Sequence, residues 1–138
     1  MKKIDVVLVE DNPKDALILL RILKKEGFGD DVKWLKDGKE AVDKLVVAEK
    51  WLPKLVLLDM KLPKLTGVEV LAILKKHPKM SQVPVVMLSS SDEKVDIKNA
   101  YRAGANAYVI KPQQYQETKM VVKMITNFWV KNNQTVYG

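Results

Sequence analysis

The sequence predicts an α/β domain in which a parallel β-sheet is covered by helices on both faces. Short apolar runs bounded by turn residues alternate along the chain with longer segments whose apolar residues recur at helical spacing. Consecutive parallel strands need a crossover, usually a helix, so this alternation is typical of a doubly wound sheet. The clearest run, residues 55–58, lies between Pro53 and Pro63 and is followed directly by Asp59. We therefore expect a buried strand that brings a carboxylate to the edge of the sheet.

Length and composition indicate one domain. The chain has 138 residues, of which 47% are hydrophobic, and this is enough for one sizeable core. We expect a single domain over residues 1–138, with a core from about residue 4 to residue 131 and a frayed tail over residues 132–138. No apolar stretch reaches the ~20 residues that cross a bilayer, and the N-terminus lacks the apolar region of a signal peptide. We expect a cytoplasmic protein without membrane contact.

Charge and residue usage narrow the possible functions. The net charge of +7 is compatible with an anionic partner. The lysines are spread over every segment, however, and no docking motif for nucleic acid accompanies them. The sequence therefore favours a solvated basic surface over nucleic-acid binding, while an acidic protein partner stays open. The absence of cysteine excludes disulfides and thiolate chemistry, and a single histidine, His77, disfavours a zinc site or a histidine-based triad.

The first strand is predicted over residues 4–9 and ends at two adjacent acids. Asn12 and Pro13 are suited to cap and to begin a helix, which we expect over residues 13–26, with Gly27 as its stop. The apolar stripe of this helix consists of Ala16, Leu19, Leu20 and Leu23.

A short second strand is predicted over residues 32–35. It is followed by a helix in which Asp37 and Glu40 have the spacing of an N-cap and a capping box. The residues expected on the buried side of this helix are Ala41, Leu45 and Ala48.

The third strand is the run over residues 55–58. Thr66 and Glu69 form another capping-box pair, so a third helix is predicted to begin there and to end near residue 77. The fourth strand candidate, residues 84–88, is almost entirely apolar or β-branched. It leads into three serines and a fourth helix that Gly104 closes.

The fifth strand is predicted over residues 107–110, and a last helix follows. Apolar residues in this helix recur at i, i+3, i+4 and i+7, a pattern typical of a core-facing stripe made by Val121, Met124, Ile125 and Phe128. Core packing is therefore expected for Phe128. Trp129 and Val130 lie partly off this stripe and are candidates for a dimer or partner surface.

Five strands and five helices in a chain of this size fit the flavodoxin-like strand order 2-1-3-4-5. All carboxyl ends of parallel strands lie at one edge of the sheet, so this edge is expected to hold Glu10, Asp11, Asp59, Ser89 and Lys111. Clustered carboxylates raise one another's pKa, and the cluster therefore favours a bound cation. Carboxylate oxygens suit Mg²⁺, with the Lys111 ammonium as an alternative counter-ion.

With these residues the sequence resembles the receiver domains of bacterial two-component response regulators, also called CheY-like domains. The resemblance covers almost the whole chain, and its opening motif and size look more like the small stand-alone receivers, including those partnered with phytochrome kinases. The motifs that carry it are Glu10-Asp11, Asp59 with Leu62-Pro63 and Gly67, Ser89, and Lys111-Pro112.

The resemblance implies a role in a phosphorelay. Asp59 would accept a phosphoryl group from a sensor histidine kinase or a phosphotransfer protein. Ser89 and Lys111 would contact that group, and the Lys111-Pro112 peptide bond would be cis. The domain would promote its own phosphorylation and dephosphorylation without being a turnover enzyme. The implied ligands of Mg²⁺ are Glu10, Asp11, Asp59 and the main-chain carbonyl of Lys61.

The resemblance also implies how phosphate becomes a signal. Ser89 would move toward the phosphate and Tyr108 would turn inward, which would alter the face formed by the fourth helix, the fifth strand and the last helix. The alternative for Tyr108 is an ordinary half-buried strand aromatic. Lys61 and Ser91 would influence the access of hydrolytic water. Output would pass to an unknown protein target, and a homodimer through the same face stays open.

Two other functions remain as alternatives. The domain could be a scaffold that is never phosphorylated, but the complete set of Asp59, Ser89 and Lys111 disfavours this. It could also be a small hydrolase or phosphotransferase that acts on a metabolite through Asp59, but so short a chain leaves no segment for a substrate-binding cap.

Overall fold

A five-stranded parallel sheet forms the centre of the protein. The computed structural model describes residues 3–137, so Met1, Lys2 and Gly138, the ends of the predicted domain, lie outside the described residues. The strand order is β2-β1-β3-β4-β5 with every neighbouring pair parallel, which confirms the predicted fold class. The strands are β1 (Val6–Val9), β2 (Val32–Leu35), β3 (Leu55–Leu58), β4 (Val85–Ser89) and β5 (Ala107–Ile110).

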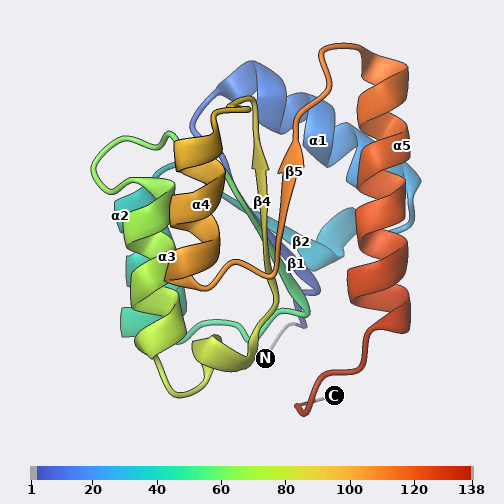
Figure 1. Ribbon diagram of the computed structural model, residues 1–138. Helices are drawn as coiled ribbons and strands as arrows, with labels where there is room; N and C mark the ends of the chain where they lie inside the picture. Colours follow the sequence, from blue (N-terminus) through green and yellow to red (C-terminus); the bar gives the residue numbers. More distant parts are fainter. Residues whose placement is uncertain (1–2, 138) are drawn as a thin grey trace.

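Helices cover both faces of the sheet (Figure 1). On one face α1 packs beside α5, and on the other α3 packs between α2 and α4. The three inner strands are buried on both sides and separate two apolar cores. Within residues 3–137 no helix is both long and apolar enough to cross a membrane. The helices are α1 (Pro13–Lys25), α2 (Gly38–Val42), α3 (Gly67–Lys76), α4 (Lys94–Ala103) and α5 (Tyr115–Thr126), with 3-10 turns η1 (Gly29–Asp31) and η3 (Met80–Gln82).

Most helix ends follow the predicted capping residues. The side chain of Asn12 accepts hydrogen bonds from two amides of the first turn of α1, and Asp37 accepts one from the first turn of α2. Thr66 and Glu69 form a complete capping box at α3. Gly104 ends α4 at a φ of 110°, a left-handed conformation that favours glycine.

The buried stripe of α5 differs from the predicted one. Met124 is exposed and Phe128 is 54% exposed, whereas Val122 is fully buried. The stripe also contains Thr118 and Thr126, whose hydroxyls donate to main-chain carbonyls of the preceding turn at 2.9 Å. Because a threonine can satisfy its hydroxyl within its own helix, both residues face the core, and a stripe defined by apolar residues alone was wrong.

Two helices end in π-helical turns. η2 (Asp43–Val47) continues α2, and η4 (Asn127–Asn132) continues α5. The i→i+5 hydrogen bonds of a π-helix rotate the residues that follow relative to α-helical periodicity. Ala48, predicted to be buried, is therefore exposed, and Val130, predicted to lie off the core, is buried; Trp129 is half-buried.

Part of the segment predicted to be a frayed tail contacts the core. The hydroxyl of Tyr137 donates a hydrogen bond to the main-chain carbonyl of Pro53 at 2.7 Å, just before β3 begins. Burial raises the pKa of Tyr137 to about 12. Residues 133–137 thus run back toward the start of the central strand (Figure 1).

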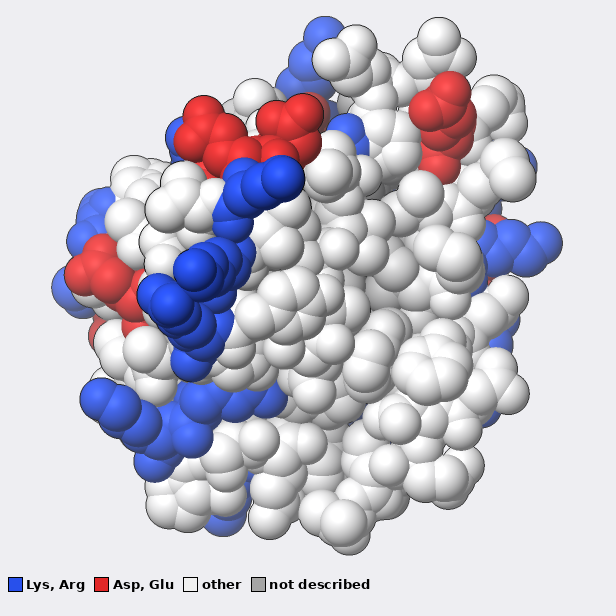
Figure 2. All heavy atoms as spheres, in the orientation of Figure 1, with Lys and Arg blue, Asp and Glu red and all other residues white. Residues whose placement is uncertain are grey.

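The basic residues are unevenly distributed over the surface. The chain carries a net charge of +7. Figure 2 shows lysine and arginine side chains gathered in a column over α4, with acidic side chains above it, whereas the region over β5 and the front of α5 is largely neutral. One face of the molecule therefore places a basic strip beside a neutral surface.

Candidate functional site

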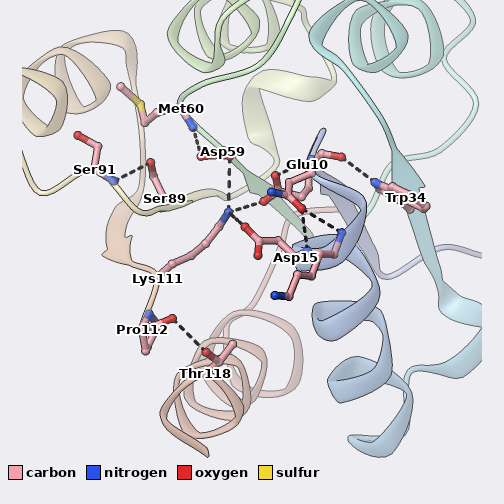
Figure 3. Close-up of polar contacts among 12 residues, drawn as sticks. Glu10, Asp15, Trp34, Asp59, Met60, Ser89, Ser91, Lys111, Pro112 and Thr118 are labelled. Carbon is pink, nitrogen blue, oxygen red and sulfur yellow. Dashed lines mark hydrogen bonds and ion pairs between the residues drawn. The ribbon is translucent and has the colours of Figure 1, made fainter. Parts of the chain in front are cut away.

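The register of the sheet brings the predicted site residues to one edge. The last residues of β1 and β3 are partners, so Glu10 and Asp59, which follow them, leave the sheet side by side. Ser89 ends β4, and the main-chain amide of Lys111 donates to its carbonyl at 2.8 Å. Figure 3 shows the side chains of these residues converging from separate strands.

The ammonium group of Lys111 lies at the centre of the site. It forms a close ion pair with Glu10 and lies 3.3 Å from Oδ2 of Asp15 and 3.6 Å from Oδ2 of Asp59. The lysine side chain is only 12% exposed. Burial alone would lower the pKa of Lys111, but the hydrogen bond to Glu10 and the neighbouring carboxylates outweigh it and raise that pKa. Lys111 is therefore a fixed cation among three acids.

Glu10 is the most deeply buried acid of the site, with 1% of its surface exposed. Its Oε2 accepts a hydrogen bond from the amide of Asn12 at 3.1 Å, and its main-chain carbonyl accepts one from the indole of Trp34 at 2.8 Å. Burial, opposed by the hydrogen bond from Lys111 and supported by the charge of Asp59, raises the pKa of Glu10 to about 7. The environment of Glu10 thus favours either protonation of its carboxyl group or the binding of a cation in addition to Lys111.

Asp59 is buried but reachable from the strand edge. Its Oδ1 accepts a hydrogen bond from the amide of Met60 at 2.7 Å, which leaves Oδ2 directed toward Lys111. Gly67, at the start of α3, packs against the same segment, since a Cβ at this position would lie 2.1 Å from the main-chain oxygen of Asp59. The glycine in the predicted motif therefore permits the close approach of α3 to Asp59.

Three acids at this edge are close enough to share one cation. Glu10, Asp11 and Asp59 each offer a carboxylate oxygen, and these oxygens lie within 4.8 Å of one another. Asp11 is exposed, and together with Lys61 it lines an open pocket of about 630 Å³. Hard oxygen donors and an open approach suit a divalent cation that keeps part of its water shell. The residues present thus fit the predicted divalent metal.

A chain of hydrogen bonds connects the strand edge to α4 and β5. The hydroxyl of Ser89 accepts from the amide of Ser91 at 3.2 Å. The hydroxyl of Ser91 donates to Asp96 in α4 at 2.5 Å, and its carbonyl accepts from the hydroxyl of Tyr108 at 2.9 Å. Tyr108 is half-buried and packs against the core. Ser91 is therefore bonded to all three of these residues.

One prediction for the site was wrong, and two residues of the site were not predicted. The Lys111-Pro112 bond is trans, as is every peptide bond in residues 3–137, so the predicted cis bond was wrong. Proline permits either isomer, and the end of β5 already directs Lys111 toward the acids. Asp15, in the first turn of α1, was missed, although it lies only four residues after Asp11 and so near the same edge of the sheet. No pattern in the sequence indicated that Trp34 would contact Glu10, because only the fold brings β2 beside this residue.

The chain is similar over most of its length to response regulators. Residues 6–123 match the family of the response regulator receiver domain. The probable methanogenesis regulatory protein FilR2 of Methanothrix harundinacea is 38% identical over 133 residues, which cover 94% of this chain and 86% of FilR2. Response regulator Rcp1 of Synechocystis is 32% identical over 130 residues, 91% of this chain and 88% of Rcp1.

Solved structures support the same similarity. The phosphorylated cyanobacterial phytochrome response regulator RcpA superposes with a TM-score of 0.89 at 33% identity, covering 98% of this chain and 99% of RcpA. The Mn(2+)-bound form of Rcp1 superposes with a TM-score of 0.82 at 31% identity, covering 97% of this chain and 99% of that structure. Both likenesses extend over the sheet edge that carries the acids.

Proposed function

The chain belongs to the response regulator receiver family, and from this premise we propose that it is switched by phosphorylation of Asp59. Receiver domains are signalling modules of two-component pathways and not turnover enzymes. The observation that supports Asp59 as phosphoacceptor is its position. One carboxylate oxygen is held by the Met60 amide, and the other lies between the Lys111 ammonium and the acids of the cation cluster. Glu10 has similar neighbours, since it accepts from the Asn12 amide and pairs with Lys111, but it is 1% exposed against 9% for Asp59, so Asp59 is the more accessible to a phosphoryl donor.

The phosphoryl donor would be a phosphohistidine of a sensor histidine kinase or of a phosphotransfer protein. Oδ2 of Asp59 attacks phosphorus, an acyl phosphate O–P bond forms, the P–N bond breaks, and the released imidazole nitrogen takes up a proton. Subsequent attack by water restores the carboxylate and releases inorganic phosphate. The domain promotes both steps on itself and releases no transformed metabolite. The likeness to RcpA, a phytochrome response regulator, supports a phytochrome-type kinase as one candidate donor.

The acids of the site would hold Mg²⁺. The ligands would be Glu10, Asp11 and Asp59, with the main-chain carbonyl of Lys61. The similarity to Rcp1, whose structure is known in a Mn(2+)-bound form, supports the binding of a divalent ion. When bound, the ion neutralises charge on the transferring phosphoryl group. In this chain Lys111 now balances the carboxylates, and its ammonium would turn from Glu10 and Asp15 to a phosphoryl oxygen.

The signal would leave the site through Ser89 and Tyr108. A phosphoryl group on Asp59 adds a charge of about −1.5 to −2 and three acceptor oxygens. The Ser89 hydroxyl can donate to one of them, which would pull on the Ser91 amide that it now binds. Because the Ser91 carbonyl holds the Tyr108 hydroxyl, the pull would reach β5 and α4.

Output would be protein contact in the cytoplasm, through a single receiver domain formed by residues 1–138, without nucleic-acid or membrane binding. The surface formed by α4, β5 and α5 exposes several large apolar side chains, which supports a protein partner there or, alternatively, a homodimer. The exposed apolar residues of these elements are Val95, Tyr101, Ile110, Met120 and Met124.

Intact-mass measurement tests the proposal. Incubation with acetyl phosphate and Mg²⁺ is expected to add one phosphate to the wild type. The adduct should be absent in Asp59→Asn and should fall strongly when EDTA replaces Mg²⁺. Asp15→Asn is the matched control, because it also removes a carboxylate beside Lys111 but leaves the phosphoacceptor. No adduct on the wild type, with folding intact, would favour the unphosphorylated scaffold, and an adduct that survives in Asp59→Asn would reject this acceptor.

A further inference from the structure

Within residues 3–137, no main-chain amide donates to the carbonyl of Glu10, the residue that follows β1. The amide of Glu10 donates to the carbonyl of Leu35 at 3.1 Å, but β2 ends at this residue, so the strand offers no further amide. Glu10 is only 1% exposed, which shields its carbonyl from water. A buried carbonyl without a donor is unfavourable, and a side chain has to supply the hydrogen bond.

The indole of Trp34 supplies this hydrogen bond. Its Nε1–H donates to the Glu10 carbonyl at 2.8 Å, and Figure 3 shows the side chain directed at this residue. Trp34 lies in β2, is half-buried, and packs against the core that α1 and α5 cover. The ammonium of the exposed Lys36 lies over the indole, 5.4 Å from the centre of the ring, a favourable contact for a cation. The indole is thus held both by the core and by a surface cation.

The bonded carbonyl belongs to the peptide unit that joins Glu10 to Asp11, two of the three acids of the cation cluster. Asp11 is exposed, and within residues 3–137 its carboxylate forms no hydrogen bond or ion pair. No side chain of the described chain therefore fixes this carboxylate. Its place relative to Asp59 depends on the orientation of the peptide unit that Trp34 holds.

A divalent ion makes strict demands on this geometry. Mg²⁺ binds oxygen at about 2.1 Å in a near-octahedral arrangement, so two oxygens on opposite sides of the ion are about 4.2 Å apart. The carboxylate oxygens of Glu10, Asp11 and Asp59 lie within 4.8 Å of one another, which is already close to this size. Rotation of the peptide unit between the first two acids would move the Asp11 carboxylate away from the others. Replacement of a residue that orients metal ligands typically weakens metal binding by about 10- to 100-fold.

We propose that Trp34 is a positioning residue for the divalent cation, because its indole N–H holds the Glu10-Asp11 peptide unit in the orientation that brings Asp11 to the other acids. Trp34 acts through these acids and is not itself a ligand of the ion. The inference rests on the proposed function, since this ion is the one that would assist phosphorylation of Asp59.

The test measures the dissociation constant of Mg²⁺ at pH 8 by isothermal titration calorimetry on the full chain. Trp34→Phe removes the N–H donor, and we expect the dissociation constant to rise about tenfold. Trp51→Phe is the matched control, because Trp51 is also half-buried and has a lysine ammonium over its ring. Trp51 lies before β3, however, at the edge of the sheet opposite to the acids. This control should bind Mg²⁺ within about twofold of the wild type.

A second substitution separates the hydrogen bond from the packing of the ring. The amino acid 3-benzothienylalanine has nearly the shape of tryptophan, with a sulfur atom in place of the N–H group. Its incorporation at position 34 should also raise the dissociation constant of Mg²⁺ about tenfold. Circular dichroism checks that each variant folds, and this shape-conserving variant decides the question if Trp34→Phe does not fold.

A double-mutant cycle tests whether Trp34 acts through Asp11. Asp11→Asn removes the carboxylate that the peptide unit positions. In this background Trp34→Phe should raise the dissociation constant of Mg²⁺ by less than about threefold, because the ligand on which Trp34 acts is already lost. A general effect of Trp34 on the fold would instead add the same tenfold weakening in both backgrounds.

Three results would overturn the inference. They are an unchanged dissociation constant in the 3-benzothienylalanine variant, an equal rise in Trp51→Phe, and the full tenfold effect of Trp34→Phe in the Asp11→Asn background. The phosphate adduct on Asp59 is measured on the same samples. Any of these results together with an adduct on the wild type rejects only the role of Trp34. A wild type that binds no Mg²⁺ and takes up no phosphate rejects the proposed function and this inference with it.

Discussion

The hydroxyl of Tyr108 donates a hydrogen bond to the main-chain carbonyl of Ser91 at 2.9 Å. This contact joins β5 to the loop after β4, the strand that ends at Ser89. The Ser91 amide donates to Ser89, and the Ser91 hydroxyl donates to Asp96. A movement of Ser89 would thus reach both α4 and β5 through Ser91.

Tyr108→Phe should destabilise the protein by about 1 kcal/mol, because it leaves the half-buried Ser91 carbonyl without this donor. Urea unfolding gives the free energy. Tyr115→Phe is the matched control: within residues 3–137 the buried Tyr115 hydroxyl has no hydrogen-bond partner, so its removal should be neutral or stabilising. Equal losses in the two variants would show that the Tyr108 bond adds nothing.

Ser91→Ala should loosen the start of α4. The variant loses the hydrogen bond to Asp96 and the acceptor for the Glu93 amide. Hydrogen–deuterium exchange in residues 92–97 should speed up by about tenfold, which corresponds to ~1.4 kcal/mol. Ser81→Ala, which removes an exposed hydroxyl bonded to the Pro78 carbonyl, should leave this exchange unchanged. Unchanged protection in Ser91→Ala would mean that packing alone holds the turn.

Stability without metal should fall as the pH rises through 7. The folded protein raises the pKa of Glu10 from 4.5 to about 7. The contribution of Glu10 to the free energy of unfolding is therefore fully present below pH 4.5 and is lost as the pH rises through 7. Between pH 5.5 and pH 8 in EDTA the free energy of unfolding of the wild type should fall by about 1–3 kcal/mol relative to that of Glu10→Gln, which has no titrating group at position 10. Urea unfolding at both pH values measures this. A difference independent of pH would place the Glu10 pKa near its ordinary value.

Magnesium affinity should follow the same titration with the opposite sign. A carboxylate must lose its proton to bind the ion, so affinity should rise with pH up to about 7 and then level off. Isothermal titration calorimetry between pH 5.5 and pH 8 measures the slope. In Glu10→Gln the slope near pH 7 should disappear. Retention of the slope in this variant would assign the titration to another group.

Lys111→Met should separate charge balance from phosphorylation. Removal of the ammonium leaves three neighbouring carboxylates without a counter-ion, so we expect a loss of about 2–4 kcal/mol in EDTA and partial recovery in Mg²⁺. Labelling by acetyl phosphate should slow by at least about tenfold. Lys75→Met is the control, because Lys75 is also half-buried. Its ammonium donates to the carbonyl of Val83, which precedes β4, whereas the acids lie at the opposite edge of the sheet, where the strands end. A normal labelling rate in Lys111→Met would exclude a contact with the phosphoryl group.

The sequence was most informative at positions where a residue type has one characteristic structural role. Capping side chains, a glycine at the end of α4 and acids after buried strands predicted the elements and the edge that they share. It failed where the structure depends on contacts that no local pattern encodes. Thr118 and Thr126 are buried because their hydroxyls bond within α5, and the π-helical turns change which residues face the core. The role of Asp15 required the position of Lys111, a residue of a distant strand.

The ion pairs of Lys111 have a kinetic consequence. The Lys111 ammonium supplies positive charge among the acids, so these carboxylates already lie close together before any divalent ion binds. Loading then exchanges one cation for another through a change in the rotamer of the Lys111 side chain. The protein should therefore stay ready to respond when the supply of the ion in its surroundings fluctuates.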